Sequence, residues 1–161
     1  MNQHGIPPET PAVTIRSARP SDTDRIVEMV GKLAAHHGDT SALTAGILRR
    51  DAFGAPPWLH LLLAEVHGEI AGFSALYGLM KLQAAERGLE LHHLFVEDGF
   101  RGLGLGVALV EASKRKAREL LCHSLTVGTH PDNLKAQAFY LSLGFERRDS
   151  FPPRFRLLLE G

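Results

Sequence analysis

The fold is decided by Arg101-Gly102-Leu103-Gly104-Leu105-Gly106, which stands between an apolar, strand-like run and an amphipathic helical pattern. Its alternating glycines leave backbone N–H groups uncovered by side chains. The helix that follows directs its unpaired first-turn N–H groups, and the positive end of its dipole, at the same point. The stretch therefore predicts a phosphate-binding turn, with the Arg101 side chain adding a cation at its mouth.

The glycine spacing excludes two well-known phosphate loops. The dinucleotide pattern G-x-G-x-x-G, read from Gly102, requires glycine at position 107, where Val107 stands. A Walker loop requires Gly-Lys-Ser or Gly-Lys-Thr, which this stretch lacks. The remaining pattern is R-x-x-G-x-G, and a glycine-rich turn without a ligand is the alternative interpretation of the hexapeptide alone.

Length and composition predict one domain of ordinary size. A chain of 161 residues can bury a substantial core, and 18 basic residues balance 18 acidic ones. This balance gives no charge signal for nucleic acid or a membrane surface as a partner. With one cysteine, Cys122, and no recognisable secretory leader or long apolar run, we expect a cytoplasmic protein. We expect a single domain over residues 13–161, after a flexible lead-in over residues 1–12.

Hydrophobic periodicity predicts the element order βααβββαβαββ. Pro20-Ser21-Asp22 is expected to supply a turn and capping residues for the first helix. Asp132 or Asn133 is expected to cap the last helix, and Gly144 to terminate it. The expected strands are residues 13–18, 59–66, 70–79, 89–96, 125–127, 145–149 and 154–159. The expected helices run from the turn at 20–22 to about 37, over 40–50, over 104–121 and from about 133 to 143.

A second motif makes the family resemblance specific. Residues 133–140 read Asn-Leu-Lys-Ala-Gln-Ala-Phe-Tyr and are followed by Gly144-Phe145. Together with R-x-x-G-x-G, this element resembles the GNAT superfamily of acetyl-CoA-dependent N-acetyltransferases, most closely its diamine (spermidine/spermine) N-acetyltransferase-like group and their thialysine-acetylating relatives. The resemblance covers nearly the whole chain from residue 13. It implies an α/β fold in which a mixed, mostly antiparallel sheet of about seven strands carries helices on both faces.

The resemblance also implies where acetyl-CoA binds. The glycine turn holds the pyrophosphate, the main chain of residues 94–96 pairs with the pantetheine amides, and the helix from Asn133 runs beside the pantetheine arm. Asn133, Ala136 and Tyr140 share one helical face, so one ligand can meet all three. The alternative for residues 94–96 is an ordinary buried strand. The complete set of implied cofactor residues is Leu94, Phe95, Val96, Arg101, Gly102, Leu103, Gly104, Leu105, Gly106, Asn133, Ala136, Phe139 and Tyr140.

Tyr140 is the candidate general acid. When an amine attacks a thioester, the departing thiolate must gain a proton. A phenol with an unperturbed pKa of about 10 keeps its proton throughout the neutral range. The resemblance places Tyr140 near the thioester sulfur, and the alternative is a tyrosine that only packs between helix and sheet.

His92 and His93 are candidate bases because they directly precede the segment expected to pair with the cofactor. An ammonium substrate must lose a proton before it attacks, and imidazole accepts protons near neutral pH. Glu90, acting through water, is a further candidate, and a packing role is the alternative for each histidine. Adjacent strand residues point to opposite faces, and the nine histidines show no ligand pair at helical spacing, so we expect no metal site.

The predicted reaction is acetyl transfer from acetyl-CoA to a primary amine of a small molecule, a polyamine, diamine or amino-acid-like compound, by direct attack in a ternary complex. Relatives that act on polycations commonly carry acidic residues where His92 and His93 stand, which argues against a polyamine here. The candidate substrate-binding residues are Glu28, Asp39, Glu90, His92 and His93. The alternatives are an acyl-CoA sensor without turnover and acetylation of protein amino groups. The resemblance also implies a homodimer.

Overall fold

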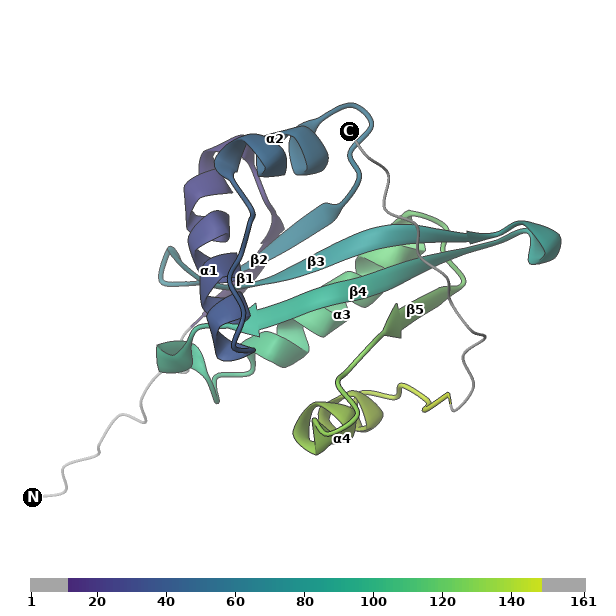
Figure 1. Ribbon diagram of the computed structural model, residues 1–161. Helices are drawn as coiled ribbons and strands as arrows, with labels where there is room; N and C mark the ends of the chain where they lie inside the picture. Colours follow the sequence, from purple (N-terminus) through teal and green to yellow (C-terminus); the bar gives the residue numbers. More distant parts are fainter. Residues whose placement is uncertain (1–11, 149–161) are drawn as a thin grey trace, which may run out of the picture. The chain divides into compact units, whose positions relative to one another are not determined.

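A computed structural model describes residues 12–148 of the chain, in two compact units, residues 1–128 and 129–161 (Figure 1). The expected lead-in, apart from residue 12, and the strand expected at 154–159 lie outside the described residues.

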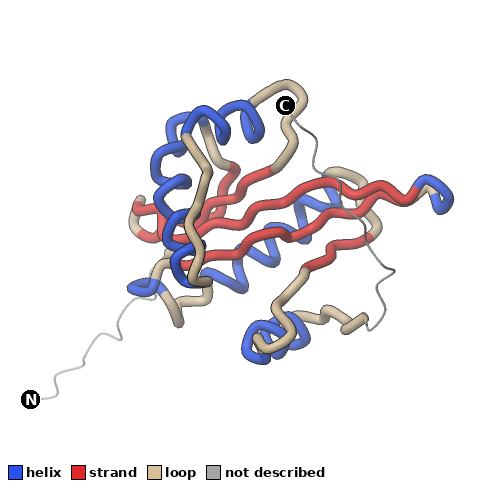
Figure 2. Tube along the Cα trace, viewed as in Figure 1, coloured by secondary structure: helices blue, strands red, loops and turns tan. Residues whose placement is uncertain are grey.

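The first unit is built on a mixed sheet of five strands in the order β1-β2-β3-β4-β5 (Figure 2). Neighbours among the first four strands are antiparallel, and β5 is parallel to β4. This confirms a mixed, mostly antiparallel sheet, with five strands in the described residues where about seven were expected. The strands are β1 (Val13–Ser17), β2 (His60–Val66), β3 (Glu69–Lys81), β4 (Glu86–Val96) and β5 (Ser124–Val127).

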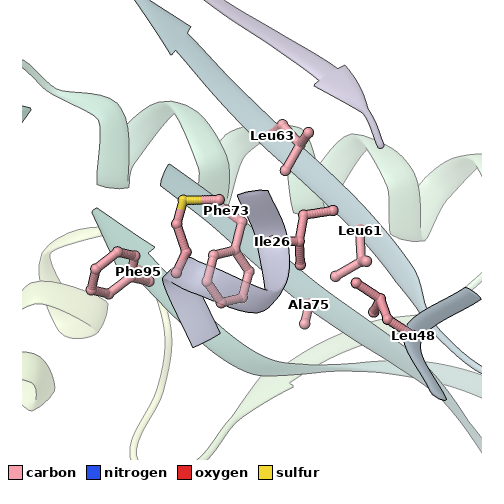
Figure 3. Packing of buried hydrophobic residues seen from close by; sticks show 8 residues of the cluster. Ile26, Leu48, Leu61, Leu63, Phe73, Ala75 and Phe95 are labelled. Carbon is pink, nitrogen blue, oxygen red and sulfur yellow. The ribbon is translucent and has the colours of Figure 1, made fainter. Parts of the chain in front are cut away.

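Helices cover both faces of this sheet, as expected (Figure 1). Helices α1 (Thr23–His36) and α2 (Ala45–Phe53) pack on one face, and α3 (Leu105–Glu119) packs on the other. Alternation along β3 separates the two faces. Phe73 joins the core beneath α1, whereas the next residue, Ser74, shares a buried hydroxyl–hydroxyl hydrogen bond of 3.2 Å with Ser113 of α3. Figure 3 shows the core under α1 and α2, built from Ile26, Met29, Leu48, Leu61, Leu63, Phe73, Ala75 and Phe95.

Local hydrogen bonds explain where two helices begin. Thr44 Oγ1 accepts from the N–H of Ile47 at 3.2 Å, so α2 starts after Thr44 and not at residue 40 as expected. The expected turn over residues 20–22 is observed, and Asp22 stands at the N-cap of α1 but makes no capping hydrogen bond to that helix. Residues Pro20–Asp22 form a short 3-10 turn, and the Asp22 carboxylate accepts from Arg16 and from the N–H of Arg19 instead of capping α1.

The second unit contains α4 (Leu134–Ser142), which begins and ends as the sequence predicts. Asn133 Oδ1 accepts from the N–H of Ala136 at 3.0 Å, and Gly144 follows the helix with φ of 84°. The strand expected at 145–149 is not observed over residues 145–148, and Asp149 lies outside the described residues. Its first N–H is already taken, because Phe145 donates to the Tyr140 carbonyl at 3.1 Å and completes the helix cap.

No helix in the described part of the chain is long and apolar enough to cross a membrane.

Candidate active site

Strand β4 continues beyond its partner β5. The parallel pairing runs from Gly88 opposite Ser124 to Leu91 opposite Val127, where β5 ends, whereas β4 continues to Val96. On its other side, β4 remains paired with β3 up to Val96. The last five residues of β4, including Leu94, Phe95 and Val96, therefore have an edge that β5 does not cover. Backbone groups on such an edge can bind an extended ligand that itself carries amide groups.

The glycine turn follows this open edge along the chain. Gly102 and Gly104 both have φ of 80°, a conformation that favours glycine, and the space that a Cβ would occupy at either position is empty. The first backbone bond of α3 is donated by Ala108 to the Gly104 carbonyl at 3.0 Å. The N–H groups of Leu105, Gly106 and Val107 thus precede the helix's own hydrogen-bond ladder, as an anion site at a helix N-terminus requires.

The segment between the strand and the turn is held by ion pairs. Glu97, with a side chain 15% exposed, accepts from Arg25 at 2.9 Å and from Lys32 at 2.8 Å, and both cations lie on α1. Arg25 also donates to the Ile70 carbonyl at the start of β3. Arg101 pairs with Asp98 at 2.9 Å, so a neighbouring carboxylate partly balances its charge. These contacts fix the end of β4 and the start of the turn relative to α1.

A β-bulge brings His92 and His93 together. His93 lies opposite Ala75 and Leu91 lies opposite Leu76, so His92 is an extra residue in β4. The two imidazole rings lie side by side, with centroids 4.1 Å apart. The expectation that they point to opposite faces is therefore wrong, because the bulge cancels the alternation at this point. The ring of Tyr77, on β3, meets the ring of His92 edge to face at 5.5 Å.

The environment of His93 keeps its imidazole neutral at physiological pH. Burial, together with the neighbouring His92 and His37, lowers the pKa of His93 to about 4. The neutral ring can accept a proton. His37 caps the C-terminal end of α1, so this helix contributes to the surroundings of the bulge.

The other predicted substrate residues have different surroundings. Glu90 accepts a short hydrogen bond from the hydroxyl of Thr126, one residue before the β4–β5 pairing ends. Glu28 pairs with both Arg25 and Lys32 at 2.9 Å, so two cations already balance its charge. Asp39 is exposed just after α1.

In the second unit, the helix cap fixes the position of Tyr140. Its carbonyl accepts from the N–H groups of Leu143 and Phe145, and its ring contacts the rings of Phe139 and Phe145 at 5.2 and 5.5 Å. This arrangement is a Schellman cap with its hydrophobic contact. It gives the spacing Y-x-x-x-G-F a structural reason. Burial raises the pKa of Tyr140 to about 12, so the phenol stays protonated in the neutral range.

Three features of this site carry no sequence signal that we could find. The pairing of Glu97 with α1, the contact of Tyr77 with His92 and the approach of His37 to His93 all depend on residues far apart in the sequence. In residues 12–148, no group of three or more His, Cys, Asp or Glu side chains is arranged to hold a metal ion.

The chain is similar to known acetyltransferases in sequence and in fold. A family model described as the acetyltransferase (GNAT) family matches residues 31–145. Thialysine N-epsilon-acetyltransferase of Bos taurus is 28% identical over 141 residues, which cover 82% of this chain and 83% of that protein. Mycothiol acetyltransferase of Sanguibacter keddieii is 34% identical over 145 residues, covering 87% of this chain and 45% of that protein. A crystal structure of a probable acetyltransferase has a TM-score of 0.79 at 22% identity, with 92% of this chain and 99% of that chain covered, and it supports the fold alone.

Proposed function

Because this chain belongs to the acetyltransferase (GNAT) family and is an acyltransferase, we propose that it transfers an acetyl group from acetyl-CoA to a primary amine of a small molecule. One observation carries the proposal: the end of β4 that β5 leaves unpaired is followed along the chain by a glycine turn at the start of a helix. This single segment offers main-chain groups for the pantetheine arm and N–H groups for the pyrophosphate.

The residues at the turn suit the diphosphate of acetyl-CoA. The open space beside Gly102 and Gly104 lets phosphate oxygens approach the backbone, and the N–H groups of the first turn of α3 donate to them. We assign pyrophosphate binding to residues 101–106, and pairing with the pantetheine amides to Leu94, Phe95 and Val96. Asn133, Ala136, Phe139 and Tyr140 are assigned to the same ligand by their match to the family motif.

The proposed reaction is direct transfer. The amine nitrogen forms a bond to the thioester carbonyl carbon, the carbon–sulfur bond breaks, and the thiolate leaves with the bonding electron pair. His93 is assigned the proton from the substrate ammonium, because its ring is neutral and lies beside the bulge. His92 and Glu90 are the other candidates for this proton. Tyr140 is assigned protonation of the thiolate, because its pKa of about 12 keeps the phenol protonated. The nitrogen then releases its second proton, which restores the Tyr140 phenol and leaves a neutral amide.

A small-molecule acceptor is supported by the names of two relatives, a thialysine N-epsilon-acetyltransferase and a mycothiol acetyltransferase. The narrower resemblance to the diamine group stays a prediction, as do the homodimer and the cytoplasmic location. For a polycation, Glu28 and Asp39 remain the predicted acidic contacts. The Glu28 carboxylate already has two cationic partners.

A thiol-release assay tests the proposal. Acetyl-CoA is incubated with the protein and, one at a time, with polyamines, amino acids, amino sugars and peptides with free N-termini. The proposal predicts amine-dependent thiol release with at least one small amine, matched by an equal amount of acetylated product. Acetyl-CoA binding without release for any amine would indicate a sensor, and release with peptides alone would indicate a protein acetyltransferase.

A further inference from the structure

A recess of about 580 Å³ opens in the first unit, next to the histidine bulge. The last turn of α2, the segment before β2 and the middle of β3 form its walls. Tyr77 connects the recess to the bulge, since it lines the recess and its ring meets that of His92 at 5.5 Å. A ligand in the recess therefore lies beside the candidate bases. The described residues that line it are Arg50, Asp51, Trp58, Leu59, Tyr77 and Gly78.

Aromatic and apolar side chains provide most of the surface that a ligand can cover. The Trp58 indole is 81% exposed, so nearly all of it is open to contact. Leu59 packs against the core under α1 and α2, and Tyr77 is half-buried, so the two extend that core to the recess. At Gly78, the position of an added Cβ has no atom within 4 Å, which leaves open space. An aromatic ring suits this lining, because ring pairs are favoured beyond the apolar area that they bury.

The charges around the recess suit an acceptor with a single ammonium group. The Arg50 guanidinium donates to both carboxylate oxygens of Asp51, at 2.6 and 2.8 Å, so these two groups satisfy each other. A second ammonium group of a substrate would gain little from the paired Asp51 and would approach the Arg50 cation. Glu90, opposite Tyr77 in the β3–β4 pairing, can serve the amine that reacts. The His93 imidazole adds no negative charge.

The backbone anchors the exposed indole at the rim of the recess. The Asp51 carbonyl accepts from the N–H groups of Trp58 and Leu59, at 2.7 and 3.3 Å. These bonds tie the end of α2 to the segment that carries Trp58. The main chain at Trp58 is therefore held in place although its side chain is exposed, which lowers the entropy lost when the indole covers a ligand.

The distance from the recess to the bulge sets the length of the ligand. Tyr77 lies two residues along β3 from Ala75, the partner of His93, which is about 7 Å at the usual rise of a strand. A phenyl ring with an extended two-carbon chain spans roughly 6–7 Å from the far edge of the ring to the nitrogen, with standard bond lengths. A ring seated against Tyr77 can thus present its amine to the bulge.

We propose that the recess holds the aromatic ring of an arylalkylamine, a primary amine of about the length of 2-phenylethylamine, and that the amine at the histidine bulge accepts the acetyl group. This inference rests on the proposed function and names its substrate class. Trp58 and Tyr77 contact the ring, and Leu59 lies beneath it. A polyamine has no ring to cover these side chains and brings further ammonium groups to Arg50.

Trp58 reports on the recess directly, because it is the only tryptophan in the chain. Its fluorescence is followed while 2-phenylethylamine, ethylamine or spermidine is added without acetyl-CoA. Since the indole is exposed, a ring that covers it should move its emission to shorter wavelength and saturate with 2-phenylethylamine alone. Leu82→Ala is the matched control, since Leu82 is 82% exposed on the outer part of the β3–β4 hairpin, and this variant should respond as wild type does.

Kinetics test whether the bound ring belongs to the acceptor. We expect kcat/KM for 2-phenylethylamine to exceed that for ethylamine and that for spermidine at least about tenfold, as burial of a phenyl ring allows. Trp58→Ala should reduce the ratio of 2-phenylethylamine to ethylamine severalfold, whereas Trp58→Phe, which keeps an aromatic ring, should retain most of it. Leu82→Ala should leave this ratio unchanged.

The outcomes separate this inference from the proposed function. Acetyl transfer that favours spermidine or ethylamine, a ratio that Trp58→Ala leaves unchanged, or an emission that does not respond to 2-phenylethylamine overturns this inference alone. Absence of transfer to every amine tested overturns the proposed function and the acceptor assigned here, whatever the emission of Trp58 shows.

Discussion

Gly104→Ala separates the ligand-binding role of the glycine turn from its role in folding. Gly104 has φ of 80°, and an alanine Cβ there meets no atom within 4 Å, so the folded protein bears only the cost of the backbone conformation. That cost is roughly 1–2 kcal/mol, which lowers Tm by about 2–8 °C in a domain of this size. The new Cβ occupies the space through which phosphate oxygens must approach the N–H groups. Loss of one charge-assisted hydrogen bond, about 1.5–3 kcal/mol, weakens acetyl-CoA binding by roughly 10- to 100-fold.

Gly68→Ala is the matched control. Gly68 also has φ of 80° and no atom within 4 Å of the added Cβ, but it lies in the tight turn between β2 and β3. Both variants should lose similar stability in thermal unfolding. Isothermal titration calorimetry should show weaker acetyl-CoA binding in Gly104→Ala only. Equal acetyl-CoA affinity in wild type, Gly104→Ala and Gly68→Ala would refute the assignment of the pyrophosphate to this turn.

Four further predictions concern protons and charge. Tyr140→Phe should lower kcat by roughly 10²-fold with little change in acetyl-CoA affinity, and near-normal turnover would leave Tyr140 a packing role. If His93 is the base, kcat/KM should rise with pH around the His93 pKa of about 4, and this rise should disappear in His93→Gln. A rise that persists in this variant points to His92 or Glu90. Because the pKa of His93 falls from 6.5 in the unfolded chain to about 4 in the folded protein, its contribution to stability is lost as pH falls from 6.5 toward 4, and His93→Gln should remove this slope from acid unfolding curves. With spermidine as acceptor, Asp39→Asn should raise KM more than Glu28→Gln does, because Glu28 already pairs with Arg25 and Lys32; the opposite order would contradict this reasoning.

Local patterns predicted much of the fold. The glycines of residues 101–106 follow an apolar strand and begin α3, and Asn133 and Gly144 mark the two ends of α4. These features depend on neighbouring residues, so the sequence contains them. The sequence pattern predicts too early a start for the second helix, because Thr40 and Thr44 offer similar capping groups. Only the hydrogen bond that Ile47 N–H donates to Thr44 Oγ1 selects between them.

The details of the candidate site depended on contacts between strands. Simple alternation places His92 and His93 on opposite faces, but the register with β3 adds a bulge and brings their rings together. Whether β5 covers the end of β4 depends on where β5 stops relative to β4. The sequence pattern predicts the length of β5 but not its register with β4. Asp22 stands at the N-cap of α1 without a capping hydrogen bond to that helix, because Arg16, on β1, provides a stronger, charged partner for its carboxylate.

Amide hydrogen exchange with and without acetyl-CoA tests the central claim most directly, because that claim rests on main-chain groups. We expect acetyl-CoA to slow exchange in peptides that cover residues 92–96 and 102–107, and to leave the outer part of the β3–β4 hairpin, residues 79–87, unchanged. Protection confined to other parts of the chain, with residues 92–107 exchanging as in the free protein, would contradict the account.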